Sequence, residues 1–69
     1  MMMQTLTALV HREDDLYVAE CPEVGTVSQG ETIEKAVENL KEATELYLEE
    51  FPLPPVGRVL ITTFDATYA

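Results

Sequence analysis

The chain has 69 residues, a formal net charge of −9 and one cysteine, Cys21. That length suits one domain with a marginal core, and a lone cysteine excludes both an intrachain disulfide and a four-cysteine metal site. The acidic charge disfavours direct binding to nucleic acid, and it favours either a basic partner or simple solubility.

The sequence carries no signal for export or membrane insertion. The N-terminus lacks a basic segment followed by an apolar run, and no apolar stretch approaches the roughly 20 residues of a membrane span. Together with the free thiol, these features predict a cytoplasmic protein. A domain this small often needs further support, and self-association is the kind that the composition leaves open.

The first half of the chain alternates apolar and polar residues with the period of β-strands. The alternation predicts strands at residues 4–11 and 16–21, which the polar turn at 13–15 joins as a hairpin. A break at residues 22–25 follows, and residues 26–28 then predict a short third strand.

The second half is dominated by an apolar stripe at three- and four-residue steps. It predicts an amphipathic helix from Ile33 to Glu50, with Thr32 as its N-cap. Pro52 and the prolines after it end the helix, and residues 58–64 predict a final strand. The stripe consists of Ile33, Ala36, Val37, Leu40, Ala43, Thr44, Tyr47, Leu48 and Phe51.

The order β-β-β-α-β predicts a two-layer α+β fold in which one helix packs on one face of a sheet. A right-handed crossover places the last strand parallel to the first, which gives the sheet order 3-2-1-4. The other face stays uncovered, and a partly apolar uncovered face makes a homodimer or a partner surface a reasonable hypothesis. We expect this face to carry either Leu6, Ala8 and Val10 with Leu16 and Val18, or Leu9 with Tyr17, Ala19 and Cys21.

Few residues are suited to catalysis. A nucleophile needs a nearby base, and the spacing does not pair His11 with Cys21 or Ser28. The first strand lacks the acid that a two-metal nuclease site would use there, and the carboxylates cluster instead in the 13–15 turn and along the helix. We therefore expect no enzyme activity, no metal and no cofactor. A residual metal-dependent nuclease that uses Asp65 is the least favoured alternative.

The helix carries a row of acids away from its apolar stripe. Glu34 and Glu38, Glu38 and Glu42, and Glu45 and Glu49 are like-charge pairs at i,i+4, and each pair is mildly destabilising. A helix selected for stability alone would mix its signs more evenly. We therefore interpret Glu38, Glu42, Glu45 and Glu49, here called the acidic ridge, as a candidate surface for a basic partner. An ordinary solubilising face is the alternative.

Two consecutive stretches, YVAECPEVGTVSQGET at 17–32 and IEKAVENLKEA at 33–43, resemble the HicB-like antitoxin domain. With the flanking strands, the resemblance covers about residues 4–64. It implies a partial ribonuclease-H-like fold. In family members with a toxin gene beside them, it also implies binding to a small basic HicA-type mRNA interferase, whose RNA-cleaving site the antitoxin blocks. An acidic protein suits this role because it can compete electrostatically with RNA.

The chain departs from the family pattern in two places. Many members carry a C-terminal helix-turn-helix or ribbon-helix-helix module, and the few residues after the predicted last strand leave no room for one. We therefore expect a single domain over residues 1–69 that does not bind DNA. Lys35 also replaces an acid that is common just before the helix alanine. The alternative to toxin masking is a solitary HicB-like adaptor or structural domain without a toxin partner.

Overall fold

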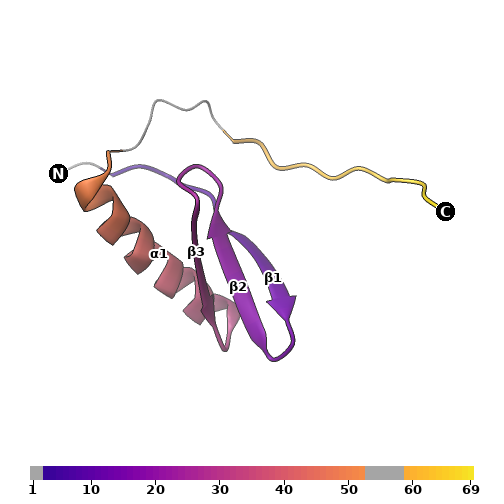
Figure 1. Cartoon of the computed structure of the whole chain (residues 1–69), viewed down its shortest axis with the longest axis horizontal. Coiled ribbons are helices and arrows are strands. Elements are labelled where there is room, and N and C mark those ends of the chain that lie inside the picture. Colours follow the sequence, from indigo (N-terminus) through magenta and orange to yellow (C-terminus); the bar gives the residue numbers. More distant parts are fainter. Residues whose placement is uncertain (1–2, 53–58) are drawn as a thin grey trace.

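The structure is a computed structural model, and it describes residues 3–52 and 59–69. Strands β1 (Leu9–Glu13), β2 (Leu16–Cys21) and β3 (Thr26–Gly30) form an antiparallel sheet of order β1-β2-β3. Helix α1 (Ile33–Glu50) follows and packs on one face of this sheet (Figure 1). The predicted two-layer α+β arrangement of three strands and a helix is therefore confirmed.

Helix α1 has the bounds that its sequence pattern predicts, because local interactions define both ends. The Thr32 hydroxyl accepts a hydrogen bond from the backbone N–H of Lys35 at 3.0 Å, as an N-cap does. At the other end, the backbone N–H of Phe51 donates to the Tyr47 carbonyl at 2.9 Å. Pro52 comes next and has no N–H with which to continue the helix.

The first two strands form a tight hairpin, but β1 begins later than the predicted strand at 4–11. Asp14 and Asp15 make the turn, Asp14 with a φ of 55°, so that Glu13 pairs with Leu16 and Leu9 pairs with Glu20. The pairing ends with Leu9 and Glu20, one residue before β2 itself ends, and residues 4–8 lie beyond the paired region. The strand β1 is therefore 9–13, so the predicted start at residue 4 and the predicted end at residue 11 were both wrong, and Glu13 belongs to the strand rather than to the turn.

Strand β3 is longer than the predicted 26–28. Gln29 and Gly30 continue the strand because Val18 and Tyr17 of β2 lie opposite them. A glycine at this position also allows a close approach to the helix. A Cβ atom on Gly30 would lie 2.6 Å from the backbone nitrogen of Ala36 and 2.8 Å from the carbonyl carbon of Lys35.

The core lies between β2 and α1. Ala19 and Cys21 from the strand meet Ala36 and Leu40 from the helix, and all four are buried. Leu6, Val10, Tyr17 and Val24 pack around this cluster and are partly buried. The small side chains at the centre let the helix lie close to the sheet.

The register decides which side chains occupy the open face of the sheet, and neither expected set was right. Val10 lies opposite Ala19 and so faces the helix, whereas His11 lies opposite Val18 on the open face. Leu9 shares that open face, because it lies opposite Glu20. Leu9, Leu16, Val18 and Val27 therefore alternate with His11, Glu13, Glu20 and Gln29 there. The open face is a mixed surface rather than a continuous apolar patch.

The helix lies toward the β3 side of the sheet. It contacts β3 most, β2 less and β1 only slightly. The Thr26 and Thr44 hydroxyls are hydrogen-bonded at 2.6 Å, and the Asn39 side-chain amide donates to the Gln29 carbonyl at 2.8 Å. These bonds hold α1 over β3. The side of α1 that lies toward β1 is therefore not covered by the sheet.

The predicted final strand at 58–64 is not formed in the described part of the chain. Arg58 lies outside the described residues, and residues 59–69 have no regular secondary structure. Leu60, Ile61 and Phe64 are 81%, 62% and 86% exposed, so they do not pack on a neighbouring strand. Figure 1 shows this part of the chain running away from the sheet. The expected sheet order 3-2-1-4 is therefore not confirmed, because residues 59–64 pair with no strand in the described part of the chain.

None of the helices within residues 3–52 and 59–69 has both the length and the apolar character that crossing a bilayer requires.

Candidate protein-binding surface

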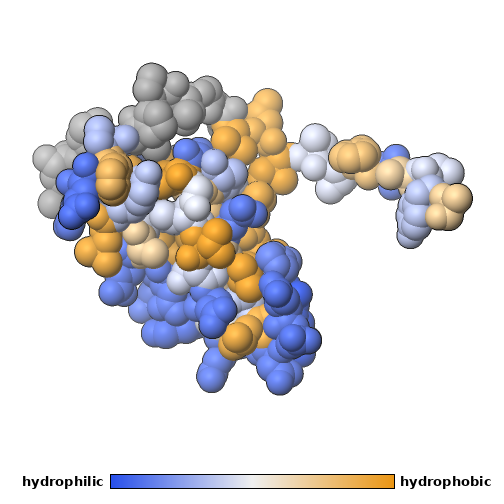
Figure 2. All heavy atoms as spheres, in the orientation of Figure 1, coloured by the Kyte–Doolittle hydropathy of each residue, from blue (hydrophilic) through white to orange (hydrophobic). Residues whose placement is uncertain are grey.

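The acidic ridge lies on the solvent side of α1. Its members follow one another at steps of four, three and four residues, and such steps bring side chains to one side of a helix. All four glutamates are exposed, whereas Ala36, Leu40 and Thr44 of the same helix are buried toward the sheet. Figure 2 shows hydrophilic residues gathered over the outer side of α1 and over the hairpin end of the sheet. The structure thus brings the four predicted residues together.

Little positive charge compensates the ridge. Lys35 Nζ lies 3.9 Å from Glu38 Oε1, and both side chains are more than half exposed. An exposed pair of this kind contributes about 0–1 kcal/mol and leaves its carboxylate accessible to another partner. Within the described ranges it is the one ion pair found along α1. The ridge can therefore present most of its negative charge to a partner.

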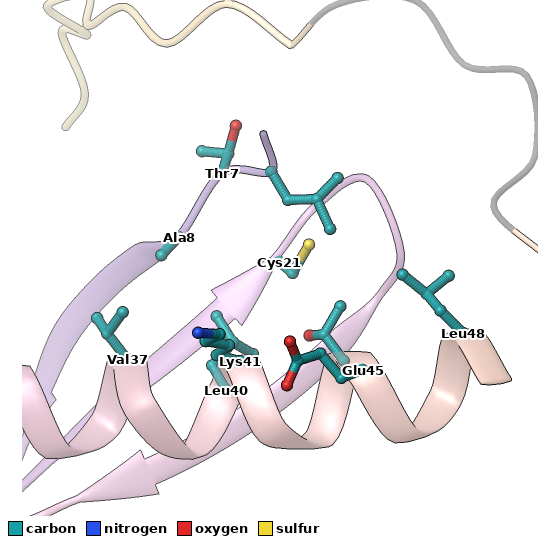
Figure 3. Close-up of a pocket in the computed structure, with 10 residues that line it drawn as sticks. Thr7, Ala8, Cys21, Val37, Leu40, Lys41, Glu45 and Leu48 are labelled. Atoms are coloured by element: carbon teal, nitrogen blue, oxygen red, sulfur yellow. The ribbon is translucent and has the colours of Figure 1, made fainter. Parts of the chain in front are cut away.

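An apolar groove lies beside the ridge, between residues 6–8 and α1 (Figure 3). It has a cavity volume of about 230 Å³, and it exists because the helix is displaced from β1. Lys41 and Glu45 are its charged residues, and Glu45 links it to the ridge. The groove is lined by Leu6, Thr7, Ala8, Cys21, Val37, Leu40, Lys41, Thr44, Glu45 and Leu48.

Sequence reasoning missed this groove, although one signal pointed to it. The apolar stripe of the helix is wider than the surface that the sheet buries. Val37 remains 37% exposed and Leu48 is only partly buried, and both line the groove. A stripe of this width indicates that the helix has apolar surface available for one more element.

Glu23 holds the N-terminal wall of the groove in place. Its Oε1 and Oε2 accept hydrogen bonds from the Thr7 backbone N–H at 3.0 and 3.1 Å, and its Oε2 also accepts one from the Thr7 hydroxyl at 2.6 Å. The hydrogen bond from the Thr7 hydroxyl is the main reason that the pKa of Glu23 lies below its ordinary value. No sequence pattern had indicated this contact, because sixteen residues separate its partners.

The floor of the groove contains a protected thiol. Cys21 is 1% exposed, and burial is the main reason that the pKa of its thiol is raised. Its Sγ also donates to Glu23 Oε1 at 3.5 Å. A thiol with a raised pKa forms little thiolate near neutral pH, so Cys21 is a core residue here rather than a ready nucleophile.

The residues weighed for catalysis do not meet. His11 is exposed on the open face, where its Nε2 lies 3.2 Å from Glu13 Oε2, whereas Cys21 faces the helix. Ser28 lies opposite Ala19, also on the helix side, and Asp65 is exposed in the C-terminal part. Across residues 3–52 and 59–69, no three His, Cys, Asp or Glu side chains are placed to share a metal ion.

The chain is similar to curated proteins from two bacteria. It is 40% identical over 55 residues to a UPF0150 protein of Synechocystis, an alignment that covers 77% of this chain and 80% of the relative. A second Synechocystis UPF0150 protein is 49% identical over 45 residues, and one of Helicobacter pylori is 43% identical over 44 residues. These two alignments cover 57% and 61% of the relatives. No family model and no solved structure matches the chain.

Proposed function

The chain belongs to the UPF0150 family, and we propose that it is an antitoxin-like binding protein that masks a small basic HicA-type mRNA interferase. The observation that carries this proposal is the acidic ridge, a row of four exposed glutamates on one side of α1. The resemblance of residues 17–43 to HicB-like antitoxins supplies the class of partner. The role belongs in the cytoplasm, where mRNA is cleaved.

The ridge works as a substitute for RNA phosphate. An enzyme that cleaves mRNA needs a positive surface to attract the phosphate backbone, and a row of carboxylates competes for the same cations. Successive glutamates on one helix side lie about 6 Å apart, or one helical turn, so a basic surface can meet several of them at once. Masking then requires no chemistry on the antitoxin, only a stable contact over the RNA-binding surface.

We extend the proposal to the complete fold. The outer edge of β1 is available in the sheet order β1-β2-β3, because β2 occupies only one side of β1. Pairing of a segment such as 59–64 with that edge would give the order 3-2-1-4, which is the partial ribonuclease-H-like arrangement that the HicB-like resemblance implies. The uncovered flank of α1 beside β1 supports this extension.

The proposal is tested by an RNA-cleavage assay with a purified HicA-type toxin and the full chain. The wild-type chain should stop cleavage at about equimolar concentration. A ridge variant, Glu38→Lys with Glu42→Lys, Glu45→Lys and Glu49→Lys, should leave the toxin active, because it turns the competing carboxylates into repelling ammonium groups. Circular dichroism of the variant checks that α1 is retained.

The matched control exchanges four exposed acids away from the ridge, namely Glu13, Asp15, Glu20 and Glu31, for lysine. It has the same net charge as the ridge variant and should inhibit the toxin nearly as well as the wild type. Equal inhibition by the ridge variant and the wild type would remove the ridge from the account. Equal loss in both variants would mean that overall charge, rather than the ridge, drives binding.

A further inference from the structure

The C-terminal segment, defined here as residues 59–64, has the composition of a strand and no neighbour. It reads Val, Leu, Ile, Thr, Thr, Phe, all residue types that favour strands or apolar burial, and none is charged. Leu60, Ile61 and Phe64 are largely exposed. Within the described residues, no backbone hydrogen bond joins the segment to the domain. An exposed, uncharged, strand-forming segment is prone to pair with any free sheet edge that it can reach.

The domain offers one edge that fits such a segment. β1 is an edge strand, and the apolar groove runs beside its entry at residues 6–8. Among the described residues, the outer edge of β3 is also unpaired, but the groove is lined by residues 6–8, which directly precede β1, so only the β1 edge combines a free strand with the groove. A strand added beside β1 would gain backbone hydrogen bonds and would direct alternate side chains into the groove.

The charge of the groove is compatible with an uncharged occupant, because Lys41 and Glu45 are its only charged lining residues in the described part of the chain. The chain carries −9 overall, and Glu45 stands at the groove beside Lys41. Most segments of so acidic a protein would bring further acids next to Glu45, whereas residues 59–64 bring none. The uncharged segment therefore suits this groove, and a second copy of the chain carries the same groove.

We propose that two copies of the chain exchange their C-terminal segments, so that residues 59–64 of each copy form a fourth strand beside β1 of the other. The segment runs away from its own sheet in Figure 1, which is the open arrangement that exchange between identical copies requires. Each half of the dimer then has the sheet order 3-2-1-4, with strand 4 supplied by its partner. This inference rests on the four-stranded fold proposed above and is independent of toxin binding.

The first test is the molar mass of the full chain in solution, measured by light scattering after size exclusion at micromolar concentrations. The wild-type chain should have the mass of two copies. Ile61→Pro should have the mass of one copy, because proline removes a strand hydrogen bond and resists pairing. Thr67→Pro, which lies beyond the segment, is the matched control and should remain a dimer. A monomeric wild type, or a dimeric Ile61→Pro, would overturn the proposal.

The second test uses the two-residue period of a strand. Leu60 and Phe64 project to one side of an extended segment, whereas Val59 and Ile61 project to the other. Substituting one of these pairs with serine should weaken the dimer much more than substituting the other, because only one side faces the groove. Equal effects of both pairs would indicate a nonspecific apolar tail and would contradict the proposal.

The third test separates exchange between copies from docking within one chain. Ile61→Pro has a defective segment and an intact groove, whereas Ala8→Trp has an intact segment and a groove filled by indole. Each variant alone should be monomeric. Because the first supplies a groove and the second supplies a segment, their mixture should form a heterodimer. If the mixture stays monomeric, the segment does not dock between chains and the proposal fails.

Discussion

The Glu23 carboxylate connects the turn after β2 to the segment that precedes β1. It lies in the turn between β2 and β3, and it accepts the hydrogen bonds that hold Thr7 beside the core. Thr7 belongs to the part of the chain that precedes the paired strand β1. The carboxylate therefore fixes a segment that the sheet itself does not hold, and with it one wall of the groove.

Glu23 should make stability depend on pH in the acidic range. Its pKa is lower in the folded chain than in the unfolded chain, mainly because the Thr7 hydroxyl donates to the carboxylate. The unfolded chain therefore binds more protons as the pH falls, so acid favours unfolding. The contribution of Glu23 is fully present above its ordinary pKa of about 4.3 and declines as the pH falls through the folded value.

The measurement is urea unfolding of the wild type and Glu23→Gln from neutral pH down to pH 3. The wild type should be more stable than the variant at neutral pH, and the difference should shrink below about pH 4.3. Glu20→Gln, which removes an exposed carboxylate from the open face, is the matched control. A difference between wild type and Glu23→Gln that stays constant down to pH 3 would contradict this account.

Helix α1 contacts β3 more than it contacts any other strand, and the absence of a side chain at Gly30 permits a close approach there. Gly30→Ala would place a methyl group against backbone atoms of Lys35 and Ala36, which cannot move away as a side chain can. The variant should lower the free energy of unfolding by about 1–3 kcal/mol, as overpacking does in well-packed cores. Thermal or urea unfolding measures this loss directly.

Gln29→Ala is the matched control for this substitution. Gln29 lies next to Gly30 on the same strand, but its side chain points to the open face and is exposed. The free energy of unfolding of the Gln29→Ala variant should stay within about 0.5 kcal/mol of the wild-type value, as for most surface substitutions. If Gly30→Ala were equally harmless, the helix would not lie as close to β3 as described.

The elements that local sequence determines were predicted with correct bounds. Helix α1 depends on a continuous apolar period, a threonine cap and a proline stop, all of which lie within its own segment. β2 was also right. The bounds of β1 and β3 instead depend on where β2 begins and ends, because a strand extends only as far as its partner does. The alternation continues through residues 4–8, past the last pair between Leu9 and Glu20, so the pattern alone did not reveal where β1 begins.

The features of the candidate site divide in the same way. Local sequence predicts some of them, and contacts between distant residues determine the others. The acidic ridge follows from helical periodicity alone, so its four glutamates could be assigned from the sequence. The groove depends on the displacement of α1 toward β3, and the bond between Thr7 and Glu23 joins distant positions. Whether residues 59–64 form a strand depends on a neighbouring strand with which they can pair, and no local pattern specifies that neighbour.

At the scale of the whole molecule, charge and apolar surface are separated. The acidic ridge faces solvent from α1, while the groove and the C-terminal segment hold the uncommitted apolar side chains. In the function and the dimer proposed above, one surface would bind a basic partner while the other would join two copies. A dimer of this kind would present two ridges, and a second contact strengthens binding wherever both can engage at once.

In the proposed function, the ridge binds a basic toxin through electrostatic contacts. The most direct measurement is the dissociation constant of the full chain and a purified HicA-type toxin, by isothermal titration calorimetry at low and high salt. The account predicts binding that weakens as salt increases, and a ridge variant whose affinity at low salt is lower by at least roughly tenfold, or about 1.4 kcal/mol. Binding of equal strength by the wild type and the ridge variant, or no binding at low salt, would contradict it.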